Sequence, residues 1–171
     1  MDDTVNAQTL GSHEIVNSLD REFARLHLNS IGVIANTSVE ILYTVPARTR
    51  VGSLRSVGES VLRYAAAIEQ TFGGITANLW DDPFEWTLPE HLSTPDKVAE
   101  HLAEVDKIRK RAFSSFVDDA CLLKHVALPT VETRPLIGLL LETLVRATDY
   151  QAQALMALKI LSRISPPGFI I

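Results

Sequence analysis

Apolar residues recur every three to five positions through most of the chain, which is the spacing of one face of an α-helix. Glycine and proline interrupt this pattern at residues 45–55, 81–95 and 126–134. The pattern therefore predicts four long helices, over residues 12–43, 56–74, 94–116 and 136–163. No stretch alternates strongly enough to predict a strand, and short connections favour antiparallel neighbours. We expect an all-α fold, a four-helix bundle of the up-and-down type.

Capping residues stand at the predicted helix starts. Ser56 and Glu59 match a capping box, in which the serine oxygen accepts a hydrogen bond from the amide three residues later. Thr94 precedes Pro95, and proline suits the first position of a helix because its missing N–H has no partner there. The same arrangement of threonine and proline at residues 133–135 predicts a cap before the fourth helix.

Length and composition narrow the class of protein. The 171 residues suit one domain over residues 1–171, with residues 1–11 expected to form a flexible N-terminal segment. A net charge of -5, without a run of lysines or arginines, argues against nucleic acid as a partner. No apolar run approaches the ~20 residues needed to cross a membrane. The acidic start and the lone Cys121 favour a cytoplasmic protein without disulfides.

Charged residues at helical spacing form two stripes, one on the second predicted helix and one on the fourth. The stripes consist of Glu59 and Arg63 on the second helix, and of Glu142, Arg146, Asp149, Tyr150 and Gln153 on the fourth. Their glutamate–arginine pairs could be exposed ion pairs, worth about 0.3–0.5 kcal/mol each. Alternatively the two stripes face each other across the bundle, where the sites of such folds are built from facing helices.

Other signatures of metal or nucleophilic chemistry are missing from the sequence. It contains no HxxxH, HExxH, CxxC or GxSxG motif and no phosphate-binding glycine loop. His27 shares the apolar face of the first predicted helix, either as a core histidine or as a supporting residue of a site. We therefore expect no metal and no cofactor.

Five short segments match, in order, the landmarks of a known family. They are residues 56–65 at the start of the second helix, 93–98 at the start of the third, 139–142 and 150–155 in the last helix, and the tail 165–168. These segments resemble the DinB/YfiT-like superfamily of four-helix bundles, in which three histidines bind a divalent metal. The resemblance implies that these ligand positions fall on Arg63, Arg146 and Tyr150. Arginine stays protonated and offers only donors, so the resemblance implies a metal-free member.

Two alternatives for function follow from this resemblance. Guanidinium groups and a tyrosine hydroxyl suit the oxygen atoms of carboxylate or phosphate. The preferred hypothesis is therefore a metal-free bundle that binds a small, anionic molecule or works as an interaction protein. The alternative is an enzyme of the family's type, a metal-dependent hydrolase or thiol-dependent transferase, which needs ligands that the matched positions lack. The resemblance also implies a homodimer.

The register of the two matching family motifs implies an expectation about burial. We expect Arg63 and Arg146 to face each other inside the bundle with Glu59 and Glu142, and Asp149 to be a further supporting carboxylate. Leucines surround the stripe of the fourth helix, which favours a buried position. Replacing either arginine would then strand a buried carboxylate, at a cost of about 3–5 kcal/mol.

Overall fold

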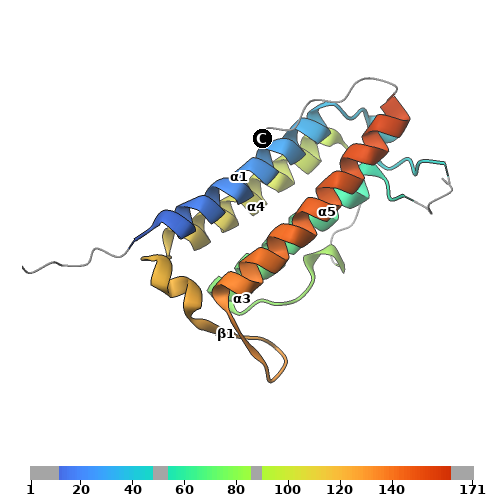
Figure 1. Ribbon diagram of the computed structural model, residues 1–171. Helices are drawn as coiled ribbons and strands as arrows, with labels where there is room; N and C mark the ends of the chain where they lie inside the picture. Colours follow the sequence, from blue (N-terminus) through green and yellow to red (C-terminus); the bar gives the residue numbers. More distant parts are fainter. Residues whose placement is uncertain (1–11, 48–53, 86–89, 163–171) are drawn as a thin grey trace, which may run out of the picture.

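The structure is a computed structural model that describes residues 12–47, 54–85 and 90–162. These residues form an all-α fold of the bundle type with one small hairpin, as Figure 1 shows. The long helices are α1 (Glu14–Ala35), α3 (Val57–Ala77), α4 (Pro95–Ser114) and α5 (Leu136–Ser162). The all-α prediction is confirmed, whereas the predictions for residues 1–11 and 165–168 lie outside the described residues. None of the described helices combines the length and the apolar character that a membrane crossing requires.

Each long helix packs against two of the others. The contact between α3 and α5 is the most extensive, and α4 and α1 complete the ring, so that α1 and α3 lie diagonally opposite. The Tyr43 hydroxyl donates to the Leu92 carbonyl, so the segment after α1 meets the start of α4. Thr71 and Thr143 are hydrogen-bonded, so the second half of α3 meets the start of α5. The helices therefore run up, down, down and up (Figure 1), which differs from the alternating order predicted from the sequence.

The length of one connection explains this difference in order. Residues 78–94 join α3 to α4, and an extended chain of that length reaches about 55 Å. The axis of α3 measures only about 32 Å, so the connection can return to the end of the bundle where α3 began. A short turn would have forced α4 to run antiparallel to α3.

The first predicted helix is interrupted. α1 ends at Ala35, and the short α2 (Val39–Leu42) follows after a break. The Asn36 side chain donates to the Gly32 carbonyl at 2.8 Å, and the Thr37 hydroxyl donates to the Val33 carbonyl at 2.7 Å. Polar side chains of this kind compete with the backbone for its hydrogen bonds, which ends the helix earlier than the apolar spacing indicates.

A hairpin replaces the cap that the sequence predicts before the last helix. β1 (His125–Ala127) and β2 (Thr133–Pro135) pair antiparallel, with Val126 opposite Arg134. The Thr133 hydroxyl lies 3.2 Å from the Nδ1 atom of His125 and does not cap α5. The hairpin leads directly into α5 and lies at the end of the bundle where that helix begins (Figure 1).

Two predicted caps are present, and a third comes from a distant residue. The Ser56 hydroxyl accepts from the Glu59 amide at 3.1 Å, and the Thr94 hydroxyl accepts from the Lys97 amide at 3.4 Å. The start of α1 is capped by Asp119, which begins the 3-10 helix η2 (Asp119–Leu123). Its carboxylate accepts from the backbone amides of residues 15 and 16 at 3.1 and 2.9 Å.

A buried charge cluster joins α1 to α4. The Arg109 side chain is 4% exposed, and its Nε donates to Asp106 at 2.8 Å while Nη1 pairs with Asp20. Lys110 pairs with the other Asp106 oxygen at 2.8 Å. Burial raises the pKa of Asp106, but the hydrogen bonds from Lys110 and Arg109 outweigh burial and hold that pKa below its usual value. This arginine is therefore fully compensated by neighbouring carboxylates.

Candidate functional site

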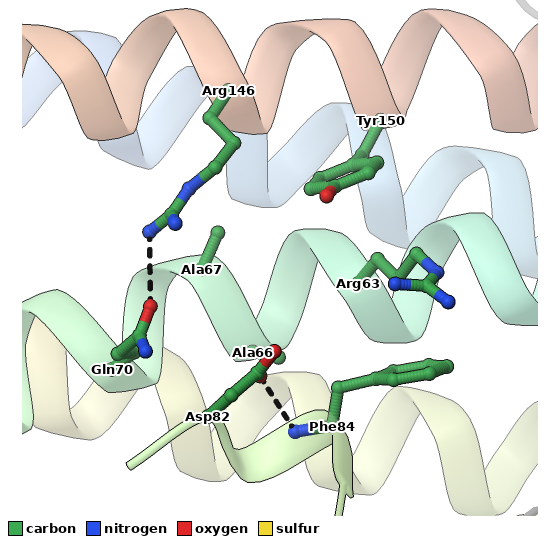
Figure 2. Close-up of a pocket in the computed structure, with 8 residues that line it drawn as sticks. All are labelled: Arg63, Ala66, Ala67, Gln70, Asp82, Phe84, Arg146 and Tyr150. Atoms are coloured by element: carbon green, nitrogen blue, oxygen red, sulfur yellow. Dashed lines mark hydrogen bonds between the residues drawn. The ribbon is translucent and has the colours of Figure 1, made fainter. Parts of the chain in front are cut away.

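Arg63, Arg146 and Tyr150 line one small cavity between α3 and α5 (Figure 2). The short helix η1 (Pro83–Glu85) and the residue before it, Asp82, close one side of this cavity. Its volume is about 30 Å³, which accommodates water but no larger molecule. The structure thus brings together the three positions singled out from the sequence, in a space too small for a ligand of their own.

Arg63 is already engaged. Its Nε donates to Glu59 at 3.0 Å, and its guanidinium lies 4.0 Å from the centre of the Phe84 ring. The Arg63 and Glu59 side chains are 29% and 35% exposed, so this pair lies at the edge of the bundle and not in its core. Arg55 also approaches Glu59, at 3.3 Å. The prediction of a buried Arg63–Glu59 pair is therefore wrong.

Arg146 lacks a carboxylate partner. Its Nη2 donates to the neutral Gln70 side chain at 3.3 Å, which is drawn as a dashed line in Figure 2. Its buried Nε makes no hydrogen bond with any described residue, and no described carboxylate lies within ion-pair distance of the guanidinium. Gln70 is itself held by the Trp80 carbonyl, to which its Nε2 donates at 2.9 Å. A half-buried guanidinium is thus held in place without being neutralised.

The predicted pairing of Arg146 with Glu142 is wrong. Glu142 accepts from Arg134 at 2.6 Å, and its side chain is 59% exposed. Arg134 belongs to β2, whereas the sequence predicts a helix cap there. The sequence pattern therefore does not indicate Arg134 as a partner of Glu142. Asp149 is exposed as well and accepts from Gln153 at 2.8 Å. No buried carboxylate would therefore be stranded by the loss of Arg146.

His27 lies in a different part of the bundle. It is half-buried near Asp106, Arg109 and Lys110, on the side where α1 meets α4. Burial lowers the pKa of His27, the Asp106 carboxylate opposes this effect, and the two neighbouring cations lower that pKa further. His27 therefore belongs to the α1–α4 charge cluster and does not line the cavity of Arg146.

An open groove of about 380 Å³ adjoins the small cavity and shares Gln70 and Arg146 with it. α3 and α5 form its floor, while Trp80 and the hairpin form its walls. The groove is lined by Gln70, Thr71, Trp80, Leu128, Pro129, Thr130, Glu132, Arg134, Leu139, Glu142, Thr143 and Arg146. Its volume falls in the range of small-molecule sites, about 300–1,000 Å³. Arg146 thus lies at the wall between a water-sized cavity and a ligand-sized groove.

The hydroxyl groups at the floor of the groove are already used as donors. Thr143 donates its hydroxyl hydrogen to the Leu139 carbonyl at 2.7 Å. Because a hydroxyl has one hydrogen, Thr71 is the donor in its own 2.7 Å hydrogen bond with Thr143. Among the groove's buried groups, the donor left for a ligand is the guanidinium of Arg146. The chemistry offered at this point is recognition of an anion.

Several residues of the groove were not predicted from the sequence, although the sequence pattern indicates two of them. Gln70 follows Arg63 by seven residues, which places both on the same side of α3. Gly74 packs against the Trp80 ring, where any Cβ would collide with it. A helical glycine of this kind indicates a close approach by another group. Arg134 and Glu132 had no local signal, because their position depends on the hairpin.

Comparison with known proteins leaves the family open. No protein-family model, curated protein or solved structure matches this chain. Among the described residues, no group of three or more histidine, cysteine, aspartate or glutamate side chains is placed to hold a metal ion. The geometry around Arg146 is therefore the observation that bears on function.

Proposed function

We propose that this protein binds a small anionic molecule, with a carboxylate or phosphate group, in the groove beside Arg146. The observation that carries the proposal is the half-buried guanidinium whose described partner is a neutral amide. A charge withdrawn from water is normally matched by an opposite charge, since its desolvation costs several kcal/mol. An anion in the groove would supply that match and would accept hydrogen bonds from the guanidinium group.

The surroundings of Arg146 support binding and not merely local charge balance. Gln70 orients the guanidinium, and the Trp80 carbonyl in turn orients Gln70, so the donor is preorganised. Trp80, Leu128 and Leu139 give the groove apolar surface beside the charge. Such a combination of apolar walls with a few placed polar groups is typical of small-molecule sites.

The resemblance to DinB-like bundles is retained as part of this proposal. In its support, the three positions that match the family's metal ligands share one cavity. They carry two arginines and a tyrosine, which suit an anion and not a cation. The family's hydrolase or transferase activity is the alternative function, and it would require a metal held by other residues.

Titration with a matched pair of compounds tests the anion site. Hexanoate and inorganic phosphate are the anions, and hexanamide is the uncharged control. In a Trp86→Phe variant, we expect hexanoate or phosphate, but not hexanamide, to change Trp80 fluorescence in a saturable way. Arg146→Gln should weaken that binding at least about tenfold, the loss of one charge-assisted contact. Arg111→Gln is the matched control, because Arg111 is exposed in the last turn of α4 and lines neither the cavity nor the groove.

The outer face of α5 supports a second candidate, self-association. Exposed apolar side chains follow this face over most of the helix: Leu141, Val145, Met156 and Ile160. Exposed apolar rows of this kind mark interaction surfaces. Glu142 lies near one end of the row and Lys159 near the other, so antiparallel pairing of two copies brings opposite charges to the same level. We infer that a second copy of this chain covers α5 in a homodimer.

Light scattering tests this second candidate. The wild-type protein should show twice the mass of one 18.9 kDa chain at micromolar concentration. The double variant Val145→Glu with Met156→Glu should be monomeric, because it buries like charges at the proposed interface. Val117→Glu is the control, since Val117 is 69% exposed but lies outside α5. A monomeric wild type would overturn the homodimer and leave the anion site untouched.

A further inference from the structure

The groove beside Arg146 contains charged groups of both signs. Arg134 and Glu142 neutralise each other at 2.6 Å. Two charges then remain: the Arg146 guanidinium and the carboxylate of Glu132, which has no ion-pair partner in the described part of the chain. A purely anionic ligand would satisfy Arg146 but would face the unpaired Glu132.

These two remaining charges come from different elements that line the groove. Arg146 is fixed on α5 by Gln70, and Glu132 belongs to the turn between β1 and β2. The turn is held closed where the Leu128 amide donates to the Glu132 carbonyl at 3.1 Å. Glu132 and Arg146 form no ion pair with each other, although both line the groove.

Apolar groups line the same groove. The groove residues of α5 run from Leu139 to Arg146, a rise of about 10 Å along the helix. Leu128, Pro129 and Trp80 border the same stretch. A ligand that reaches from Arg146 toward the hairpin therefore needs an apolar middle part and a second polar end.

From this arrangement we propose that the ligand is zwitterionic: a carboxylate bound by Arg146 and an ammonium group bound by Glu132, joined by a short apolar chain. This inference rests on the proposed anion site and specifies its ligand class. The carboxylate would accept from the guanidinium group of Arg146, and the ammonium group would donate to Glu132. A dianion would gain nothing from its second charge, because the unpaired carboxylate of Glu132 repels it.

Calorimetric titration of the full-length protein with matched compounds tests this inference. The zwitterions are 4-aminobutanoate, 6-aminohexanoate and 8-aminooctanoate, each compared with the unsubstituted acid of the same length. At least one zwitterion should bind about tenfold or more tightly than its matched acid. In Glu132→Gln this difference should disappear while the affinity for the acid is retained. Glu100→Gln, at an exposed position on α4, is the control and should leave the difference unchanged.

The outcomes separate this inference from the proposed function. If the acids bind in an Arg146-dependent manner and no zwitterion binds more tightly, the anion site stands and the zwitterion inference is overturned. If Glu132→Gln weakens the acids and zwitterions equally, Glu132 acts only through the hairpin structure, and the inference is again wrong. If neither the acids nor the zwitterions nor phosphate bind, both proposals fail.

Discussion

Arg109 and Arg146 each lie on a helix of the same bundle, but their surroundings differ. Arg109 is 4% exposed and has two carboxylates, one from its own helix and one from α1. Arg146 is half-buried and has one neutral amide as its described partner. The α1–α4 side therefore has its charges balanced internally, whereas the α3–α5 side leaves a positive charge that a ligand can balance. A charged side chain with opposite charges beside it serves the structure, whereas a half-buried charge without them is a candidate for binding a ligand. Burial alone does not separate the two cases.

The largest effect is expected from breaking the compensated side. Arg109→Met should lower the free energy of unfolding by about 3–5 kcal/mol, because it leaves the buried Asp106 carboxylate with only the exposed Lys110 as its partner. Urea denaturation measures the change. The double variant Arg109→Met with Asp106→Leu should recover much of the loss, since it removes the unpaired charge as well. A single variant within about 0.5 kcal/mol of wild type would show that this cluster does not stabilise the fold.

A smaller effect should come from a glycine on the other side. Gly74→Ala forces a methyl group into the Trp80 ring and should cost about 1–3 kcal/mol through overpacking. It should also weaken hexanoate binding, because Trp80 holds Gln70 and Gln70 orients Arg146. Gly32→Ala is the matched control: a methyl group there meets open space, so the change should stabilise α1 by about 0.5–1 kcal/mol. Thermal unfolding of the two variants should therefore shift in opposite directions.

Arg146→Met should not lower the free energy of unfolding, in contrast to Arg109→Met, and should raise it by up to about 1 kcal/mol, because it removes a half-buried charge without an opposite partner. Loss of the Arg146 guanidinium leaves no buried carboxylate without a partner, because Glu142 pairs with Arg134. Arg63→Met should cost no more than about 1 kcal/mol, as expected for a partly exposed pair. The same denaturation experiment measures both variants. A loss of 3 kcal/mol or more, on the order of a broken buried pair, would contradict the contrast drawn between the two sides.

The smallest effect concerns pH and two half-buried histidines, His27 where α1 meets α4 and His101 on α4 near Glu69 of α3. Burial lowers the pKa of His27 from its ordinary value of 6.5, and it lowers the pKa of His101 in the same direction. The unfolded chain therefore binds protons at these positions more readily than the folded chain. Stability should be full above pH 6.5 and should fall as the pH drops toward the lowered pKa values. Unfolding measured between pH 5 and 8 should show a weaker slope in His27→Gln; an unchanged slope in both His27→Gln and His101→Gln would contradict this assignment.

Local patterns predicted the helices well, and tertiary contacts decided their boundaries and directions. The caps at Ser56 and Thr94 depend on residues three positions away, so the sequence was sufficient to find them. The break after Ala35 was missed, because three successive polar residues end the helix while the apolar spacing continues. The parallel direction of α3 and α4 was missed for another reason: periodicity contains no information on where a long connection returns.

For the candidate site, helical spacing placed Arg63 on one stripe and both Arg146 and Tyr150 on another. The family resemblance singled out these three positions, and they share a cavity. Only the tertiary structure decided which charges are balanced. Arg134, in the hairpin that leads into α5, forms an ion pair with Glu142 of that helix. Asp119 caps α1, although most of the chain length separates the two. Both contacts join residues from separate elements. The period of a helix orders neighbours within one helix, whereas partners from different elements depend on how those elements pack in three dimensions.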